Sequence, residues 1–254
     1  MILTDTHTHL YGEEFDADRK EMITRANAAG VQKFYLPGID SSAIESMIQM
    51  EQDYPGQCFA MMGLHPCYVK ENWKEELKIV EDWLAKRPFP AVGEIGLDFY
   101  WDTSFKDAQY EAFHTQIEWA IHYKLPIVIH TRNAMQETID VVKGYAGKGL
   151  FGIFHCFGGS IENAKDIIEA GFYLGIGGVV TYKKSGLAEV LTDIPLKHIV
   201  LETDAPYLTP VPFRGKRNES SYLKYVVDKL VQVYGTSAEE IAAITTANAA
   251  TIFK

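Results

Sequence analysis

The sequence predicts an α/β protein with a (β/α)8 barrel (TIM barrel) fold, and three observations lead to this class. Short apolar segments alternate with longer segments of helical periodicity along the chain. His7, Leu36, His65 and Glu94 recur at intervals of 29 residues, the spacing of successive βα units. The length of 254 residues and the hydrophobic content of 47% suit such a barrel, as a single domain over 1–254.

Each expected strand is a short apolar run, and strands joined by helical crossovers form a parallel sheet. The expected strands span 2–9, 31–36, 58–64, 91–97, 126–131, 152–157, 172–178 and 198–203. The main alternative architecture is an open, doubly wound sheet. No glycine-rich nucleotide-binding loop supports that alternative, so the closed barrel is preferred.

The expected helices fill the intervals between the strands and carry ordinary end signals. They span 16–30, 41–52, 74–86, 105–124 and 160–171, with terminal helices at 219–234 and 237–250 that complete the outer ring. Asp16 and Ser160 are placed to cap helix N-termini. Gly30 and Gly171 fall where a glycine commonly ends a helix.

The charge balance and the cysteines limit the possible function. Lys and Arg number 24 against 34 Asp and Glu, a net charge of −10, which argues against bulk-charge binding to nucleic acid or anionic membrane. A local basic patch stays possible. Cys58, Cys67 and Cys156 form no C-x-x-C pair, so neither a disulfide framework nor a thiolate zinc site is expected. Without a leader or a long apolar stretch, a cytoplasmic protein with no membrane association is expected.

Histidines and carboxylates gather at the carboxyl ends of the predicted strands. His7 and His9 end the first strand, where a spacing of two residues would point both rings to one side. The other members of this set are His65, Glu94, His130, His155 and Asp204. Because the carboxyl ends of barrel strands converge on one mouth, these side chains should become neighbours. The remaining histidines, His114, His122 and His198, are expected to be structural.

This set predicts a metal centre. Buried carboxylates such as Glu94 and Asp204 need a counter-charge, and no Lys or Arg lies in the strand ends beside them. Imidazoles and carboxylates together are good ligands for a divalent ion. Six ligands exceed the needs of one four-coordinate ion with an open position, so two ions are expected, as Mg²⁺, Mn²⁺ or Zn²⁺. The expected ligands are His7, His9 and Asp204 for one ion, His130 and His155 for the other, and Glu94 between them.

Hydrolysis is the chemistry that such a centre suits best. A metal pair lowers the pKa of bound water to around 7 and stabilises charge on the substrate. Asp204 is expected to orient or deprotonate the attacking water, and Glu94 to bridge the ions, which makes both residues catalytic. A metal-stabilised binding protein without turnover is the alternative outside the enzymes.

Several motifs together resemble the TatD family of metal-dependent hydrolases, within the amidohydrolase-like barrels. These motifs are DTHTHL (5–10), GLHP (63–66), GEIGLD (93–98), LPIVIHTR (125–132), HCFGG (155–159), LETDAPYLTP (201–210) and the terminal ANAATIF. The resemblance implies a TIM barrel, a two-metal centre on the same six positions, and DNase activity, often from the 3′ end of single strands. GKRNES (215–220) resembles the family's K-x-N-E-P pattern, with Ser220 where proline is usual.

The expected substrate contacts lie in the loops around the mouth. Arg132, Arg214 and Arg217 are expected to grip phosphates, although an exposed basic loop would look the same. Tyr100 and Trp101 are expected to stack on an unpaired base, against the alternative that they pack on the barrel.

His65 is a further expected contact, as a hydrogen-bond donor to a phosphate oxygen, unless it only supports a metal ligand. A transient DNA substrate and a monomer are expected. A deacylase of aminoacyl-tRNA and a small-molecule amidohydrolase or lactonase are the alternative enzymes.

Overall fold

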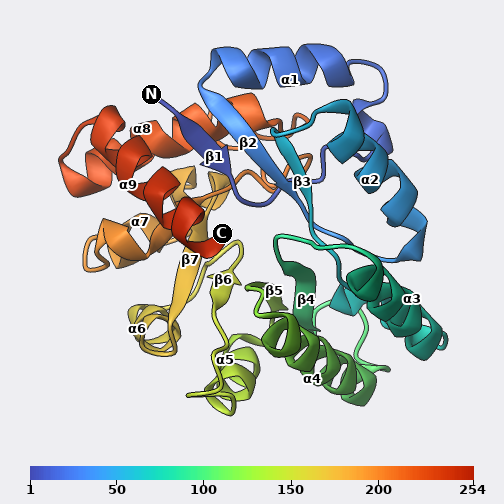
Figure 1. The fold of residues 1–254 in the computed structure, drawn as a ribbon. Helices are drawn as coiled ribbons and strands as arrows, with labels where there is room; N and C mark the ends of the chain where they lie inside the picture. Colours follow the sequence, from blue (N-terminus) through green and yellow to red (C-terminus); the bar gives the residue numbers. More distant parts are fainter.

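Eight strands lie at the centre of the protein and helices surround them, as the computed structural model of residues 1–254 shows (Figure 1). The strands are β1 (Leu3–Asp5), β2 (Val31–Leu36), β3 (Cys58–Ala60), β4 (Val92–Asp98), β5 (Ile127–Arg132), β6 (Gly152–Phe154), β7 (Phe172–Ile176) and β8 (Ile199–Leu201). All neighbouring strands pair in parallel. This arrangement is the predicted (β/α)8 barrel.

The barrel is built from two sheets, β1-β2-β3 and β4-β5-β6-β7-β8, which meet at two seams. The seam between β3 and β4 is crossed by a parallel bridge between Met62 and Val92 and by a hydrogen bond from Gly93 N to Met62 O of 3.0 Å. The seam between β8 and β1 is crossed by a hydrogen bond of 2.9 Å from Thr6 N to Leu201 O. Further backbone hydrogen bonds lie beside these, from Gly38 N to Gly93 O at 2.9 Å and from His9 N to Ala205 O at 2.8 Å, so the backbone joins the two sheets at both seams.

The helices follow the strands in the expected alternation. They are α1 (Arg19–Ala28), α2 (Ile44–Asp53), α3 (Trp73–Lys86), α4 (Lys106–Tyr123), α5 (Met135–Lys143), α6 (Ile161–Glu169), α7 (Leu187–Leu191), α8 (Leu223–Tyr234) and α9 (Ala238–Ile252). Short 3-10 turns are η1 (Glu13–Phe15), η2 (Ser41–Ala43), η3 (Pro66–Tyr68), η4 (Gly178–Thr181), η5 (Leu196–His198) and η6 (Ser220–Tyr222). No helix combines the length and the apolar character that crossing a bilayer requires.

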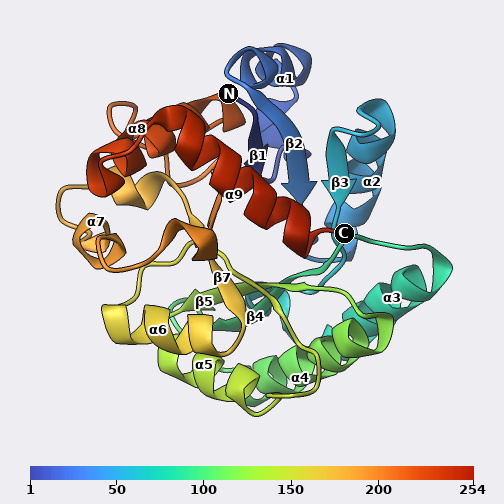
Figure 2. The same cartoon turned by 60° about the vertical axis from the view of Figure 1, so that its left-hand side comes forward.

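The interior of the barrel is apolar and is closed at one end by α9. Inward-facing side chains from the two sheets form a cluster with the last residues of α9, namely Tyr35, Met61, Ala91, Val128, Ile153, Val200, Ala249, Ile252 and Phe253. Figure 2 shows α9, in red, running across the barrel toward the C-terminus. Hydrogen bonds from Thr246 to Ile2 O and from Asn248 to Ile199 O attach α9 to the amino ends of β1 and β8. The carboxyl ends of the strands therefore form the open mouth.

The end signals of the helices were predicted with mixed success. Ser160 caps α6 and forms a capping box with Asn163, which confirms that prediction. Asp16 does not cap α1, because the N-cap position of that helix is occupied by Asp18. Asp16 instead forms an ion pair with Arg19 at 2.7 Å. Helix α1 consequently begins at Arg19, three residues after the predicted start.

Candidate metal centre

The segment that carries His7 and His9 lies beyond β1, so the predicted strand over 2–9 was too long. Strand β1 ends at Asp5, and the regular ladder stops there, because the amides of Thr6 and Thr8, which would face the same neighbour in a regular strand, bond to β8 and β2. Thr6 N donates to Leu201 O at 2.9 Å and Thr8 N donates to Tyr35 O at 3.1 Å. With these amides held to opposite sides, the imidazoles of His7 and His9 both reach the mouth.

Glu94 lies at the centre of the cluster, fully within β4 and 2% exposed. Its two carboxylate oxygens face the imidazoles of five histidines. The oxygen–nitrogen distances are 3.1 Å to His7, 3.7 Å to His9, 3.4 Å to His65, 2.9 Å to His130 and 3.3 Å to His155. The predicted convergence of distant histidines on one carboxylate is therefore present in the structure.

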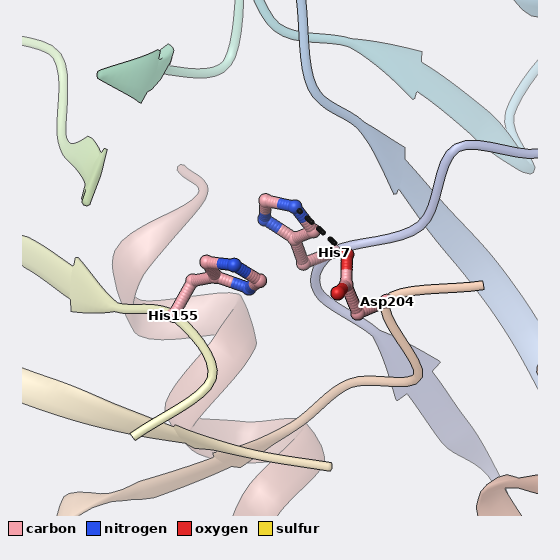
Figure 3. A group of neighbouring side chains, drawn as sticks. All are labelled: His7, His155 and Asp204. Atoms are coloured by element: carbon pink, nitrogen blue, oxygen red, sulfur yellow. Dashed lines mark ion pairs between the residues drawn. The ribbon is translucent and has the colours of Figure 1, made fainter. Parts of the chain in front are cut away.

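Asp204 completes the cluster from the loop after β8. Its Oδ1 lies 3.6 Å from His7 Nε2 and 3.5 Å from His9 Nε2, and its backbone N donates to His7 O at 2.9 Å. Figure 3 shows Asp204 and His155 approaching His7 from opposite sides, with the pair between His7 and Asp204 dashed. The rings of His7 and His155 stack with centroids 3.7 Å apart.

The donor set fits a divalent cation. Ligand atoms lie within 4.8 Å of one another in three groups, which are His7, His155 and Asp204; His7, His9 and Glu94; and His65, Glu94 and His130. His7 is completely buried, yet neither of its ring nitrogens makes a hydrogen bond. A buried polar atom without a partner is costly, and a metal ion would satisfy a lone pair on this ring. The residues present could therefore hold metal.

Burial and local charge set the protonation states of the cluster, and the histidines differ. Burial alone would lower the pKa of His130 and His155, but the carboxylates beside them outweigh it and raise the pKa of both. Burial lowers the pKa of His7, so this imidazole is neutral and offers a lone pair at neutral pH.

Burial alone would raise the pKa of Glu94, but the surrounding imidazoles outweigh it and hold that pKa well below its ordinary value. The same balance lowers the pKa of Asp204, where the nearby imidazoles, His9 first among them, outweigh the effect of burial. Both carboxylates are therefore ionised.

Three histidines have their outward nitrogens fixed by acceptors. His155 Nδ1 lies 3.1 Å from Glu202 Oε1, and His130 Nε2 lies 2.9 Å from Asp98 Oδ2. His9 Nδ1 lies 3.0 Å from the hydroxyl of Tyr11. That hydroxyl donates its only proton to Pro37 O at 2.6 Å, so it must accept from His9. With a proton on the outward nitrogen, the nitrogen facing Glu94 can offer its lone pair to a metal ion, and binding of that ion displaces any second proton on the ring.

His65 has the opposite arrangement. Its Nδ1 accepts a hydrogen bond of 3.0 Å from Cys67 N, so a neutral ring carries its proton on Nε2. Burial lowers the pKa of His65, which favours that neutral ring. Nε2 faces Glu94 Oε1 at 3.4 Å. His65 is therefore arranged as a hydrogen-bond donor at the centre, whereas His9, His130 and His155 are arranged as ligands.

Sequence reasoning missed Glu202 and Asp98, the carboxylates behind His155 and His130. Glu202 is completely buried and also accepts from Cys156 N at 2.6 Å. A Cβ on Gly175 would overlap Glu202 Oε2, so the glycine provides the room for this carboxylate. The available signal was a charged residue within an apolar run, in VLETD and in EIGLD, which is the same signal that identified Glu94 and Asp204.

We expect Glu202→Ala to weaken metal binding by about 10- to 100-fold, because His155 loses the partner that fixes its orientation. Glu202→Gln keeps an oxygen that can accept from both His155 Nδ1 and Cys156 N, and should retain more of the affinity. Titration of the metal-free protein with Zn²⁺ or Co²⁺ measures the effect. Equal affinity of Glu202→Ala and the wild type would exclude this role.

The predicted substrate contacts have different surroundings. The guanidinium of Arg132 stacks 3.8 Å from the ring centroid of Tyr100 and 5.2 Å from that of Trp101, and both aromatic side chains are exposed, by 50% and 68%. The backbone amides of Tyr100 and Trp101 donate to Asp98, which links this loop to His130. Arg214 is exposed and lies over the ring of Tyr182 at 3.9 Å.

Arg217 is engaged elsewhere. Its guanidinium donates to Asp18 Oδ1 at 2.7 Å and Oδ2 at 2.9 Å, and it lies over the ring of Phe15 at 4.5 Å. Asp18 also pairs with Arg25, which in turn binds Glu219. These contacts fasten the loop after β8 to α1, and they do not support the predicted role of Arg217 as a phosphate contact.

Comparison with known proteins gives one consistent family. A family model described as "TatD related DNase" matches residues 4–254. The "Uncharacterized metal-dependent hydrolase YabD" of Bacillus subtilis is 41% identical over 254 residues, covering 100% of this chain and 99% of the relative. The "3'-5' ssDNA/RNA exonuclease TatD" of Erwinia tasmaniensis is 31% identical and covers 98% of each chain.

Solved structures agree with this match. The crystal structure of YJJV, a TatD homolog from Escherichia coli, superposes with a TM-score of 0.93 at 29% identity and covers 99% of this chain and 97% of its own. A hydrolase TatD family protein from Entamoeba histolytica, at 20% identity and a TM-score of 0.85, shares the fold over 100% of this chain and 98% of its own. The chain therefore belongs to the TatD family of metal-dependent hydrolases.

Proposed function

We propose that the chain is a metal-dependent deoxyribonuclease that hydrolyses phosphodiester bonds of single-stranded DNA from the 3′ end. The observation that carries this proposal is the buried cluster around Glu94, in which acceptors hold the outward nitrogens of three imidazoles and His65 presents an N–H. Relatives named as single-strand exonucleases, such as the one from Erwinia tasmaniensis, support the choice of substrate. The whole length of the chain is shared with these relatives.

The proposed ligands follow from the cluster. His7, His9 and Asp204 would hold one divalent ion, His130 and His155 a second, with Glu94 between them. Mg²⁺, Mn²⁺ and Zn²⁺ all suit this mixed nitrogen and oxygen set. When bound, such ions polarise the phosphoryl oxygens and lower the pKa of water at the centre.

The other proposed roles belong to side chains that face the mouth. Asp204 is ionised and accepts a proton from the attacking water, which it also orients. His65 donates its Nε2–H to a non-bridging phosphate oxygen, because Cys67 N keeps the proton on that nitrogen. Arg132 neutralises phosphate charge, and the exposed rings of Tyr100 and Trp101 contact an unpaired base.

Incubation with end-labelled DNA tests the proposed function. We expect a ladder of products from 5′-labelled single strands when Mg²⁺, Mn²⁺, Zn²⁺ or Co²⁺ is present, and none with chelator. Double strands should be degraded more slowly, since their ends must first unpair. Single-stranded RNA is tested in the same assay, because the relative from Erwinia tasmaniensis is named for both nucleic acids.

The same assay contains the results that would contradict the proposal. Oligonucleotide binding without cleavage under every metal would exclude the enzyme in favour of a binding protein. Cleavage of small esters, amides or aminoacyl-tRNA with no effect on DNA would assign the centre to a different hydrolase reaction.

A further inference from the structure

Two neighbouring loops at the mouth carry basic side chains and no acidic ones. Residues 177–188, after β7, contain Lys183 and Lys184. Residues 205–218, after β8, contain Arg214, Lys216 and Arg217. In a chain with a net charge of −10, such a region is a local concentration of positive charge.

The two loops are fastened together into one surface. Tyr182 donates its hydroxyl hydrogen to Thr209 O at 3.0 Å, and Val211 N donates to Thr181 Oγ1 at 2.9 Å. Arg214 stacks on Tyr182 across the junction at 3.9 Å. We call the four exposed cations on this surface, Lys183, Lys184, Arg214 and Lys216, the basic shelf.

The cations of the basic shelf are free to bind an anion. All four are exposed, and none of them makes an ion pair with a carboxylate, whereas Arg217 pairs with Asp18 and Lys70 pairs with Asp102. A cation without an internal partner keeps its full charge for a ligand. The basic shelf is therefore available in a way that Arg217 is not.

The basic shelf belongs to loops that leave the same strand ends as the candidate metal centre. The loop after β8 carries Asp204 among its first residues, and Gly175 of β7 makes room for Glu202, which holds His155. Burial raises the pKa of the Tyr182 phenol, Arg214 opposes this, and Cys156 and Asp204 add to it. Loops after strands seven and eight commonly bind phosphate in barrels of this kind.

We propose that the basic shelf binds the sugar–phosphate backbone of a single nucleic-acid strand, beyond the nucleotide whose phosphodiester lies at the metal centre. The inference rests on the proposed function and adds the path of the strand. Flexible lysines suit phosphates better than base edges, so this contact increases affinity for long strands without reading sequence. A substrate too short to reach the basic shelf should gain nothing from it.

Charge reversal tests the path. The test variant is Lys183→Glu/Lys184→Glu, and the control variant is Lys148→Glu/Lys197→Glu. The control makes the same change in net charge, but its exposed lysines precede β6 and β8 at the closed end of the barrel. Binding of a fluorescent oligothymidylate of about 12 nucleotides is measured with chelator present, across a salt series. Cleavage of this strand and of a dinucleotide is measured with metal.

We expect Lys183→Glu/Lys184→Glu to weaken binding of the long strand by roughly 10-fold or more and to reduce the salt slope by about 0.7 per lost phosphate contact. Dinucleotide cleavage should stay within about twofold of wild type, and the control variant should match wild type throughout.

Equal weakening in both variants, or an equal loss on the dinucleotide, would overturn the proposed path. If wild type cleaves strands but the variant binds them normally, the basic shelf is excluded while the proposed function stands. Absence of cleavage by wild type, with binding lost only in the shelf variant, would refute the proposed function and support the shelf.

Discussion

Asp204→Asn is expected to lower kcat for DNA hydrolysis by about 10²- to 10⁴-fold, the usual contribution of a general base. The carboxylate is ionised, because the nearby imidazoles, His9 first among them, outweigh the effect of burial on its pKa. Asn cannot accept the proton of the attacking water. It keeps a carbonyl oxygen of similar position, and Glu94, His130 and His155 are unchanged, so most metal binding should survive.

Metal content and turnover must be measured on the same sample of this variant. Asp193→Asn is a suitable control, since Asp193 is exposed and precedes β8 at the closed end. Full activity of Asp204→Asn with bound metal would exclude the assigned role. Loss of metal together with activity would instead make Asp204 chiefly a ligand.

Metal removal is expected to lower the melting temperature by about 5–10 °C. The cluster takes His7 and His9 from beyond β1 of the first sheet, and Glu94, His130 and Asp204 from the second. An ion held by both sets would join the two sheets at the mouth, in addition to the backbone hydrogen bonds that cross the seams. Metal at about 100 times its Kd adds about 2.7 kcal/mol, and each kcal/mol shifts the melting temperature by about 2–4 °C at this chain length.

Thermal unfolding with metal and with chelator measures this effect, and hydrogen exchange locates it. The amides of Thr6 and Gly93, which cross the two seams, should lose more protection on chelation than that of Ile153, inside the second sheet. His7→Asn should lose the metal-dependent shift in melting temperature. His122→Asn, which changes an exposed residue of α4, should retain that shift. Uniform loss of protection would show that the ion does not act through the seams.

The periodicity of the sequence was sufficient to predict the barrel and the meeting of distant histidines. Each βα unit is a local pattern, and closure of eight units brings strand ends together whatever the details of the loops. The extent of β1 was not predictable in this way. It ends at Asp5 because the amides of Thr6 and Thr8 bond to opposite neighbours, β8 and β2, and these partners are nearly 200 and about 30 residues away in the sequence.

The finer features of the site depend on contacts between distant residues. The tautomer of His65 is set by Cys67 N, and that of His155 by Glu202, neither of which the sequence motif specifies. Arg214 and Arg217 lie three residues apart and looked equivalent in the sequence. Only the packing of the loop against α1 separates them, since it brings Asp18 to Arg217 and leaves Arg214 on Tyr182.

The packed interior and the closure of the amino end by α9 leave the carboxyl ends of the strands as the approach to the cluster around Glu94. Ala249, Ile252 and Phe253 pack against the interior side chains, and Phe253 stacks on Tyr35 with ring centroids 3.7 Å apart. A polymer cannot thread through such a barrel, as it can through a ring or a tunnel. Substrate, water and product would all enter and leave at the carboxyl end, and in the proposed exonuclease reaction each released fragment would leave before the next scissile bond takes its place.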